Sequence, residues 1–193
     1  MLTKEQFRQI NFIVPLFDVG EWSAFGNQPT DDDIQVVSSN TGDTGLLTLV
    51  GLDNADKFVT HTITLTGKTA VDSVLDPKWK TLYGAFLGDI YGKNTKAAVG
   101  TITIKEKSGG LAITTIAATK MGVGLQVFYG LRGRDVTIIQ ASGNLFLYDN
   151  GIATAANGYP FANAEKLNLC PAGDYFTLIS DTSAATAKII VWK

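Results

Sequence analysis

The chain has 193 residues, a formal net charge of −2 and a pI of about 5.3. Charged residues make up 18% of it, below the roughly 25% usual for globular proteins, so Thr, Ser, Asn and Gly must form much of the surface. The absence of a basic stripe argues against nucleic-acid binding. No apolar run is long enough for a transmembrane helix or a signal peptide, so no membrane partner is expected. Cys170 is the only cysteine, which excludes an internal disulfide.

Residues 1–33 are predicted to form an extended arm with little core of its own. Thr3 and Gln6 have capping-box spacing, which predicts a short helix over 3–10. The arm is too apolar to remain in water. It therefore either packs back on the domain or lies on a neighbouring subunit, and its candidate partner-binding residues are Phe7, Ile10, Phe12, Val14, Leu16, Phe17 and Trp22.

Residues 34–193 are predicted to form a single all-β domain of about ten to twelve strands, because short β-branched runs alternate with turn residues. The expected strands lie at 34–37, 44–67 (a hairpin that turns at 51–56), 69–74, 79–87, 99–105, 111–116, 124–129, 136–140, 144–148, 166–169, 175–180 and 188–192. Residues 117–123 are expected to be a connection and residues 151–166 a long loop. This spacing indicates an antiparallel β-sandwich or a jelly-roll-like fold.

His61 is the only histidine, and it lies in line with Val59, Ile63 and Leu65 on the apolar face of its predicted strand. A core or interface histidine with its hydrogen bonds satisfied is therefore expected. A zinc site or a serine-hydrolase triad lacks the residues that it needs. A cleft that joins His61 to an acid and a hydroxyl would favour an enzyme instead. We expect no enzymatic activity, no catalytic or metal-binding residue and no cofactor.

Two further groups of residues were considered as binding sites. Asp31, Asp32 and Asp33 offer carboxylates to Ca²⁺, but they lack the EF-hand spacing, so a solvated acidic loop is favoured. A sugar-stacking platform needs aromatic side chains on one face, and sequence spacing places no such face among Trp22, Trp79, Tyr83, Tyr91 and Tyr159. Packing in the core and at interfaces is expected for these aromatic residues.

A set of turn and strand motifs in residues 36–116 resembles a group of tailed-phage virion proteins. The pattern in that group is a Ser-rich stretch ending in Asp-Thr, then Gly-Leu-Asp, then a strand ending in Leu-x-Gly-x-x-x-Val. It corresponds here to residues 38–44, 51–53 and 65–71. Downstream, Gly-x-Ile-x-Ile, Thr-Ile-Ala and an aromatic-Tyr pair correspond to 100–104, 115–117 and 128–129. The chain departs from the pattern at 130–134, where Gly-Leu-Arg-Gly-Arg replaces a Pro-Ala-Gly turn.

The resemblance implies a phage virion structural protein, and a capsid decoration or cement protein is favoured. Such a protein is made in the host cytoplasm, binds the major capsid protein on the capsid surface and stabilises the head. By analogy, a homo-oligomer is expected and a homotrimer is favoured. The alternative is a tail or fibre component that acts as a receptor- or glycan-binding module.

Overall fold

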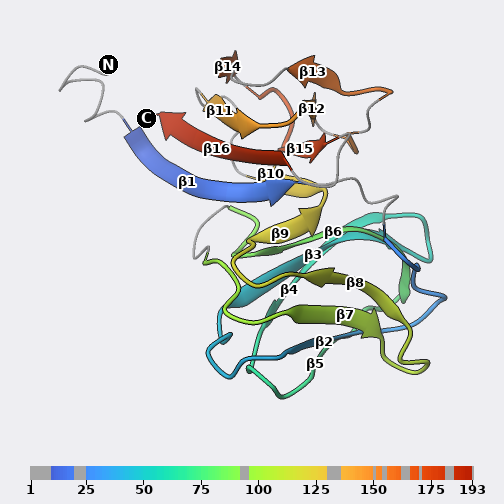
Figure 1. The fold of residues 1–193 in the computed structure, drawn as a ribbon. Coiled ribbons are helices and arrows are strands. Elements are labelled where there is room, and N and C mark those ends of the chain that lie inside the picture. The colour runs from blue at the N-terminus through green and yellow to red at the C-terminus, as the bar shows by residue number, and fades with distance from the viewer. Residues whose placement is uncertain are drawn as a thin grey trace.

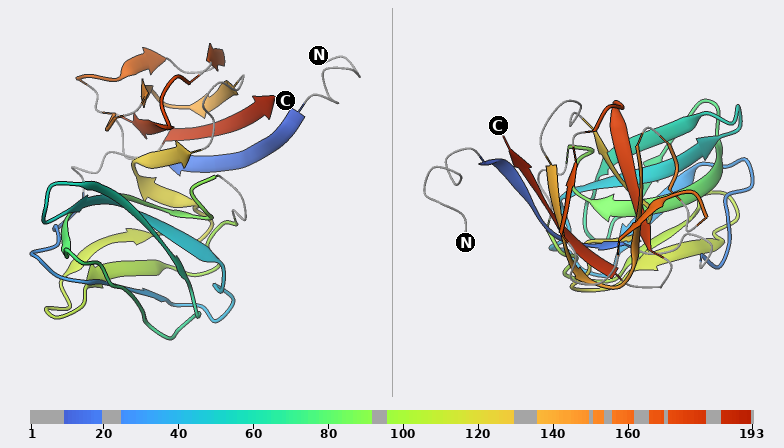
Figure 2. Two further views of the ribbon diagram at one scale, coloured as in Figure 1. Left: turned by 180° about the vertical axis from the view of Figure 1, so that it is seen from behind. Right: turned by 90° about the horizontal axis from the view of Figure 1, so that it is seen from above.

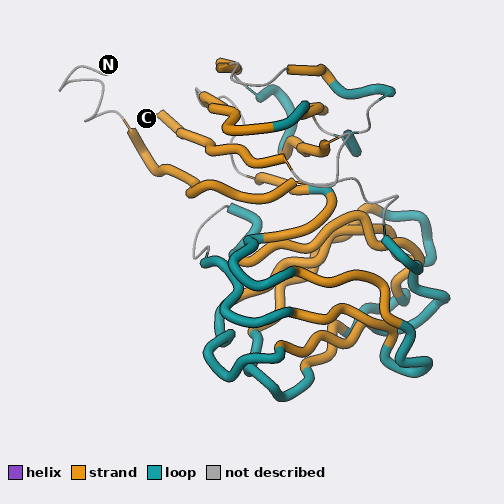
Figure 3. Tube along the Cα trace, viewed as in Figure 1, coloured by secondary structure: helices purple, strands orange, loops and turns teal. Residues whose placement is uncertain are grey.

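The chain is all-β in the part that the structure describes. The computed structural model describes residues 10–19, 25–91, 96–129, 136–149, 151–153, 156–161, 166–169, 171–180 and 185–192. These residues contain sixteen strands and no helix, and the strands form four antiparallel sheets of four strands each (Figures 1 and 3). The predicted antiparallel all-β class is confirmed.

The strands are short and follow one another closely along the chain. In order they are β1 (Ile10–Val19), β2 (Ile34–Ser38), β3 (Leu46–Asp53), β4 (Phe58–Thr64), β5 (Val71–Ser73), β6 (Trp79–Leu87), β7 (Ile102–Glu106), β8 (Ala112–Ile116), β9 (Gly122–Gly124), β10 (Gln126–Tyr129), β11 (Val136–Ser142), β12 (Leu145–Asp149), β13 (Tyr159–Phe161), β14 (Lys166–Leu169), β15 (Tyr175–Ser180) and β16 (Ala185–Trp192).

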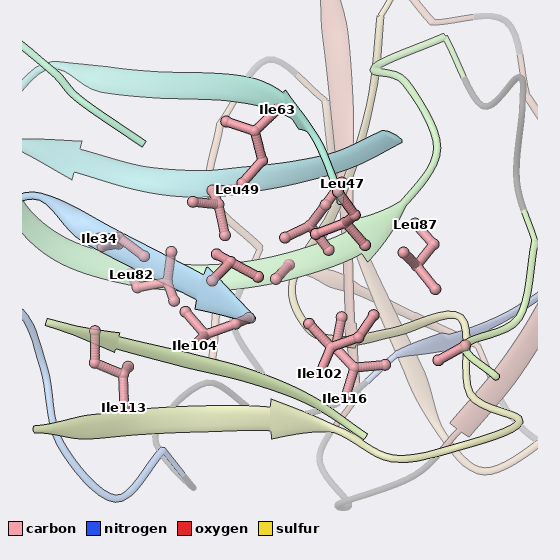
Figure 4. Packing of buried hydrophobic residues seen from close by; sticks show 14 of the residues in the cluster. Ile34, Leu47, Leu49, Ile63, Leu82, Leu87, Ile102, Ile104, Ile113 and Ile116 are labelled. Carbon is pink, nitrogen blue, oxygen red and sulfur yellow. The ribbon is translucent and has the colours of Figure 1, made fainter. Parts of the chain in front are cut away.

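Strands β2–β9 form a sandwich of two sheets, with strand orders β5-β2-β7-β8 and β4-β3-β6-β9. Alternate side chains of both sheets point into the space between them and form the main core (Figure 4). Ile34 and Ile104 come from the first sheet, and Leu49 and Leu82 come from the second; all four are 0% exposed. Complete burial of such a side chain stabilises the fold by about 1.5–3 kcal/mol.

Strand β3, in the sheet β4-β3-β6-β9, is buried on both of its faces. Five consecutive residues of β3, from Leu47 to Gly51, are buried, whereas a strand with one solvated face alternates. Leu47 and Leu49 belong to the main core, and Val50 belongs to a second cluster with Phe86, Leu125 and Val127. Strand β10 and its neighbour β15 thus cover the outer face of this sheet.

The second pair of sheets has the strand orders β1-β16-β11-β14 and β10-β15-β12-β13. It lies above the sandwich in Figure 1, and the β1–β16 pair reaches one side of the molecule in both views of Figure 2. β1 runs antiparallel to β16, with Ile10 opposite Trp192 and Val19 opposite Ala185. The ladder is irregular between Val14 and Phe17, a place where the backbone of Pro15 is tolerated.

Residues 25–33 of the predicted arm lie on the sandwich itself. The backbone N–H of Gly26 donates to the carbonyl of Ile113 at 3.1 Å, which covers the free edge of β8. The side-chain oxygen of Gln28 accepts from the backbone N–H of Leu82 at 2.8 Å. This part of the arm therefore supplies partners for backbone groups that the sheets leave unpaired.

The structure corrects several details of the predicted elements. Residues 10–19 of the arm form a strand, so a helix over 3–10 cannot include Ile10; residues 3–9 lie outside the described residues. The predicted connection 117–123 contains most of β9, and the predicted strand 124–129 contains β10, which lies in a different sheet from β9. The predicted loop 151–166 contains β13, which pairs with β12. Cys170 is also outside the described residues.

β6 and the chain after β9 approach each other closely at Gly84, and a substitution there tests this contact. A Cβ atom built on Gly84 would overlap the backbone oxygen of Leu125 and lie 2.7 Å from its nitrogen. We expect Gly84→Ala to lower the free energy of unfolding by about 2–3 kcal/mol because the backbone must shift. Gly45→Ala is the matched control, since a Cβ there meets nothing within 4 Å. Equal urea midpoints for the two variants would contradict this description of the contact.

Candidate functional site

The predicted partner-binding residues fall largely on one strand. Ile10, Phe12, Val14, Leu16 and Phe17 lie in β1, which is the edge strand of its sheet. Through the backbone, Phe12 is opposite Val191 and Phe17 is opposite Ala187. Phe7 and Trp22 lie outside the described residues. Partner binding by these residues remains a prediction.

The three consecutive aspartates point to different partners. Asp31 accepts a hydrogen bond from the side-chain amide of Asn54. Asp32 accepts from the backbone N–H of Ser108 at 2.7 Å. Asp33 is 6% exposed, and its carboxylate lies 2.7 Å from the ammonium group of Lys78. The run therefore joins loops at one end of the sandwich; the predicted solvated loop holds for the exposed Asp31 and is wrong for the buried Asp33.

A second ion pair extends this network across the sheet. The ammonium group of Lys107 lies 2.9 Å from the carboxylate of Asp72 and 3.8 Å from that of Asp33.

Within the described ranges, no three His, Cys, Asp or Glu side chains gather in an arrangement that would hold a metal ion. Among the same residues, no helix is long and apolar enough to cross a membrane.

His61 lies on the sandwich side of β4, as its sequence pattern predicts. Its Nδ1 lies 2.6 Å from the hydroxyl oxygen of Ser73, and that oxygen also accepts from the indole N–H of Trp79 at 3.2 Å. Burial lowers the pKa of His61 below its usual value of 6.5. Although His61 meets a hydroxyl, Ser73 and Trp79 are 0% exposed, so a substrate cannot reach this hydroxyl.

The carboxylate of Asp43 accepts three hydrogen bonds, and Asp43 holds three segments together. The hydroxyl of Ser38 donates to it at 2.5 Å, and the backbone N–H groups of Val99 and Gly100 donate at 2.8 and 3.0 Å. The backbone carbonyl of Asp43 accepts from Gly67 at 2.8 Å. We call this arrangement, Asp43 with Ser38, Gly67, Val99 and Gly100, the Asp43 clamp.

Burial alone would raise the pKa of Asp43, because it disfavours the charged form. The hydrogen bonds from Ser38, Val99 and Gly100 outweigh that effect and hold the pKa below its usual value of 3.8. The carboxylate is therefore ionised at neutral pH and fully engaged with donors, which suits a structural role.

The Asp43 clamp joins three motifs of the resemblance that are far apart in the sequence. Residues 38–44 provide Ser38 and Asp43, residues 65–71 provide Gly67, and residues 100–104 provide Gly100. Both glycines are required sterically. Gly67 has φ +66°, and a Cβ on Gly100 would lie 2.7 Å from the Cβ of Asn40. The motifs therefore describe how one end of the sandwich is closed.

A shallow cavity of about 50 Å³ lies beside the Asp43 clamp, between Leu46, Leu65, Leu87, Lys96 and Val99. Binding sites for drug-sized molecules are roughly 300–1,000 Å³. This cavity is therefore too small for a drug-sized ligand.

The described aromatic residues of the candidate sugar platform differ widely in exposure. Trp79 is 0% exposed in the core, whereas Tyr91 and Tyr159 are 49% and 62% exposed. Tyr83 is half-buried against the second core cluster. Trp22 lies outside the described residues. Trp79 therefore has no surface to offer to a sugar.

A different aromatic group forms the seam between the sandwich and the second pair of sheets. The ring of Tyr175 stacks on Phe58 at a centroid distance of 5.2 Å and lies 5.1 Å from the ring of Tyr129. Burial raises the pKa of Tyr129 and Tyr175 above the usual value of 10.0, so both stay neutral. Sequence spacing did not reveal this group because its members come from β4, β10 and β15.

Comparison with known proteins adds no assignment. No protein-family model and no curated protein matches the chain. Among solved structures, it is similar to YcfD, a ribosomal oxygenase from Escherichia coli, with 12% identity and a TM-score of 0.33 over 79% of this chain and 40% of YcfD. It is also similar to YhaK from Escherichia coli, with 9% identity and a TM-score of 0.30 over 96% of this chain and 88% of YhaK. Similarity at this level carries no argument about function.

The Asp43 clamp predicts a strong dependence on one carboxylate. In Asp43→Asn the amide nitrogen must face one of three N–H or O–H donors, so we expect a loss of about 2–3 kcal/mol in the free energy of unfolding at pH 7. Asp56→Asn is the control, because Asp56 is 66% exposed and its pair with Lys80 is worth little.

The same group sets a pH dependence. Since folding lowers the pKa of Asp43, its contribution is complete above the unfolded value of about 3.9 and declines as pH falls through the folded value. Urea unfolding from pH 7 to pH 3 should show a smaller loss in Asp43→Asn than in the wild-type protein. Parallel curves would show that Asp43 is not the group responsible.

The aromatic seam predicts that Tyr175 contributes more to stability than an exposed tyrosine. Tyr175→Ala removes two ring contacts, each worth about 0.5–1.5 kcal/mol, so we expect a loss of about 2 kcal/mol. Tyr159→Ala, at a 62% exposed position, should change stability by less than about 0.5 kcal/mol. Thermal unfolding measures both, and equal effects would contradict the importance of the seam.

Proposed function

We propose that this chain is a structural protein of a phage virion, and more narrowly a decoration or cement protein that binds the major capsid protein and stabilises the head. One observation carries the proposal: the segment with the virion-protein motifs, 36–116, nearly coincides with the sandwich of β2–β9, residues 34–124. Apart from residues 128–129, which lie in β10, the motifs form strands and turns of that sandwich, so the resemblance concerns nearly a whole folding unit.

The polar groups of the sandwich support a scaffold role. Asp33, Asp43 and His61 each connect separate strands or loops, and each is engaged with partners inside the molecule. A docking protein needs a rigid surface more than it needs a reactive group. Under this proposal the protein is made in the host cytoplasm and resides on the capsid surface.

The edge of β1 and the rest of the arm are the proposed contact with the major capsid protein or with sister subunits. An edge strand presents backbone N–H and C=O groups on its open side, and a neighbouring chain can pair with them. A homotrimer remains the favoured assembly by analogy with decoration proteins. The alternative role, a glycan-binding tail or fibre component, receives less support because Trp79 is 0% exposed.

The proposal is tested by mixing the full-length protein with empty capsid shells of the cognate phage. We expect saturable co-sedimentation with expanded shells and greater resistance of the decorated shells to heat. The double variant Phe7→Ala, Trp22→Ala should bind at least tenfold more weakly if the arm makes the contact, whereas Tyr159→Ala should bind normally.

Analytical ultracentrifugation of the free protein tests the expected trimer independently. Absence of binding to shells, together with detection of the protein in purified tails, would reject the capsid role in favour of the tail or fibre alternative.

A further inference from the structure

The hydroxyl group of Ser73 is sealed between two other polar side chains. Ser73 is 0% exposed, and its oxygen lies 3.2 Å from the indole nitrogen of Trp79 and 2.6 Å from Nδ1 of His61. An indole N–H can only donate, so the oxygen of Ser73 accepts from Trp79. The hydroxyl hydrogen of Ser73 then needs an acceptor, and Nδ1 of His61 is the acceptor within reach.

This geometry fixes the tautomer of the neutral imidazole. Nδ1 of His61 carries no hydrogen, and the ring hydrogen is on Nε2. Protonation would add a hydrogen at Nδ1, directly opposite the hydroxyl hydrogen of Ser73. If the hydroxyl turns away, its hydrogen has no water to bond, because Ser73 is completely buried.

The hydrogen bond between His61 and Ser73 crosses one open side of the sandwich. His61 is on β4, the edge strand of one sheet, and Ser73 ends β5, the edge strand of the facing sheet. β5 has only three residues, and β2 holds it along one side. Loss of the contact to β4 therefore weakens the attachment of a short strand.

The charged groups of the neighbouring elements do not offset a proton on His61. The charged groups on β3, on β5 and around the start of β6 have other partners. Asp53 accepts hydrogen bonds from the N–H groups of Ala55 and Lys57, and Asp72 contacts the side chains of Gln35 and Lys107. Lys78 pairs with the carboxylate of Asp33, and Lys80 pairs with the carboxylate of Asp56. His61 itself is the one titratable group of β4.

We propose that His61 is a proton-sensitive latch: in its neutral form it holds β5 against β4, and on protonation it releases this side of the sandwich while the other strands stay paired. Burial of the ring acts in the same direction, since it lowers the pKa of His61 below 6.5. The closed latch is therefore fully stable above pH 6.5 and weakens as pH falls below that value. The latch depends on the fold alone and not on the proposed capsid role.

The test uses the full-length protein, in which one histidine gives one set of imidazole signals. Nitrogen-15 NMR at pH 7.5 should show Nδ1 without a hydrogen. Amide exchange at pH 7.5 and pH 5.0, corrected for intrinsic rates, should show a loss of protection of about tenfold or more in 58–64 and 71–73. Residues 102–106 and 112–116 should keep theirs.

Two variants sharpen the result. His61→Asn keeps an acceptor near the position of Nδ1 but cannot take up the proton, so its protection should not change between the two pH values. In Ser73→Ala the opposing hydroxyl is gone, so the pKa of His61 should rise towards 6.5. The wild-type measurements decide the question even if either variant fails to fold.

Three results would overturn the latch. One is a hydrogen on Nδ1 at pH 7.5, one is equal protection of 58–64 and 71–73 at both pH values, and one is an equal loss in all strands. A loss of protection in His61→Asn as large as that in the wild-type protein would also show that another group titrates.

Discussion

The sheet β4-β3-β6-β9, whose strand β3 is buried on both faces, is the part on which the remaining structure depends. Its inner face closes the sandwich, and its outer face is the floor on which β10 and β15 rest. A sheet in this position needs a run of buried residues and places where other chain segments come close. In β3 the residues Leu47–Gly51 are all buried, and in β6 the missing side chain of Gly84 lets the backbone of Leu125 come close.

The buried polar groups serve the same architecture. Asp43 connects loops that the chain separates by more than fifty residues, and His61 connects the edges of two facing sheets. A buried carboxylate with three donors is costly to form but even more costly to disrupt, because each lost donor leaves a buried group unsatisfied. This asymmetry makes the closed end of the sandwich specific.

Sequence patterns predicted those structural features that depend on residues close together in the chain. The alternation in β4 identified its buried face, and the strands expected at 99–105 and 111–116 correspond to β7 and β8. The failures involve partners remote in sequence. No local signal tells that β1 pairs with β16, so residues 1–33 were expected to be an arm. The split between β9 and β10 rests on Gly124 at φ +71°, and the role of Ser73 depends on Trp79 and His61, which only the tertiary fold brings together.

The pairing of β1 with β16 has a consequence for biosynthesis. β1 leaves the ribosome before strands β2–β15, and its partner β16 leaves it after them, so this sheet is incomplete until β16 has been made. The sandwich of β2–β9 needs only residues 34–124 for its strands, so it can form on the nascent chain before β16 is made. During that interval β1 has no partner strand, so its unpaired backbone is exposed and is a target for chaperones.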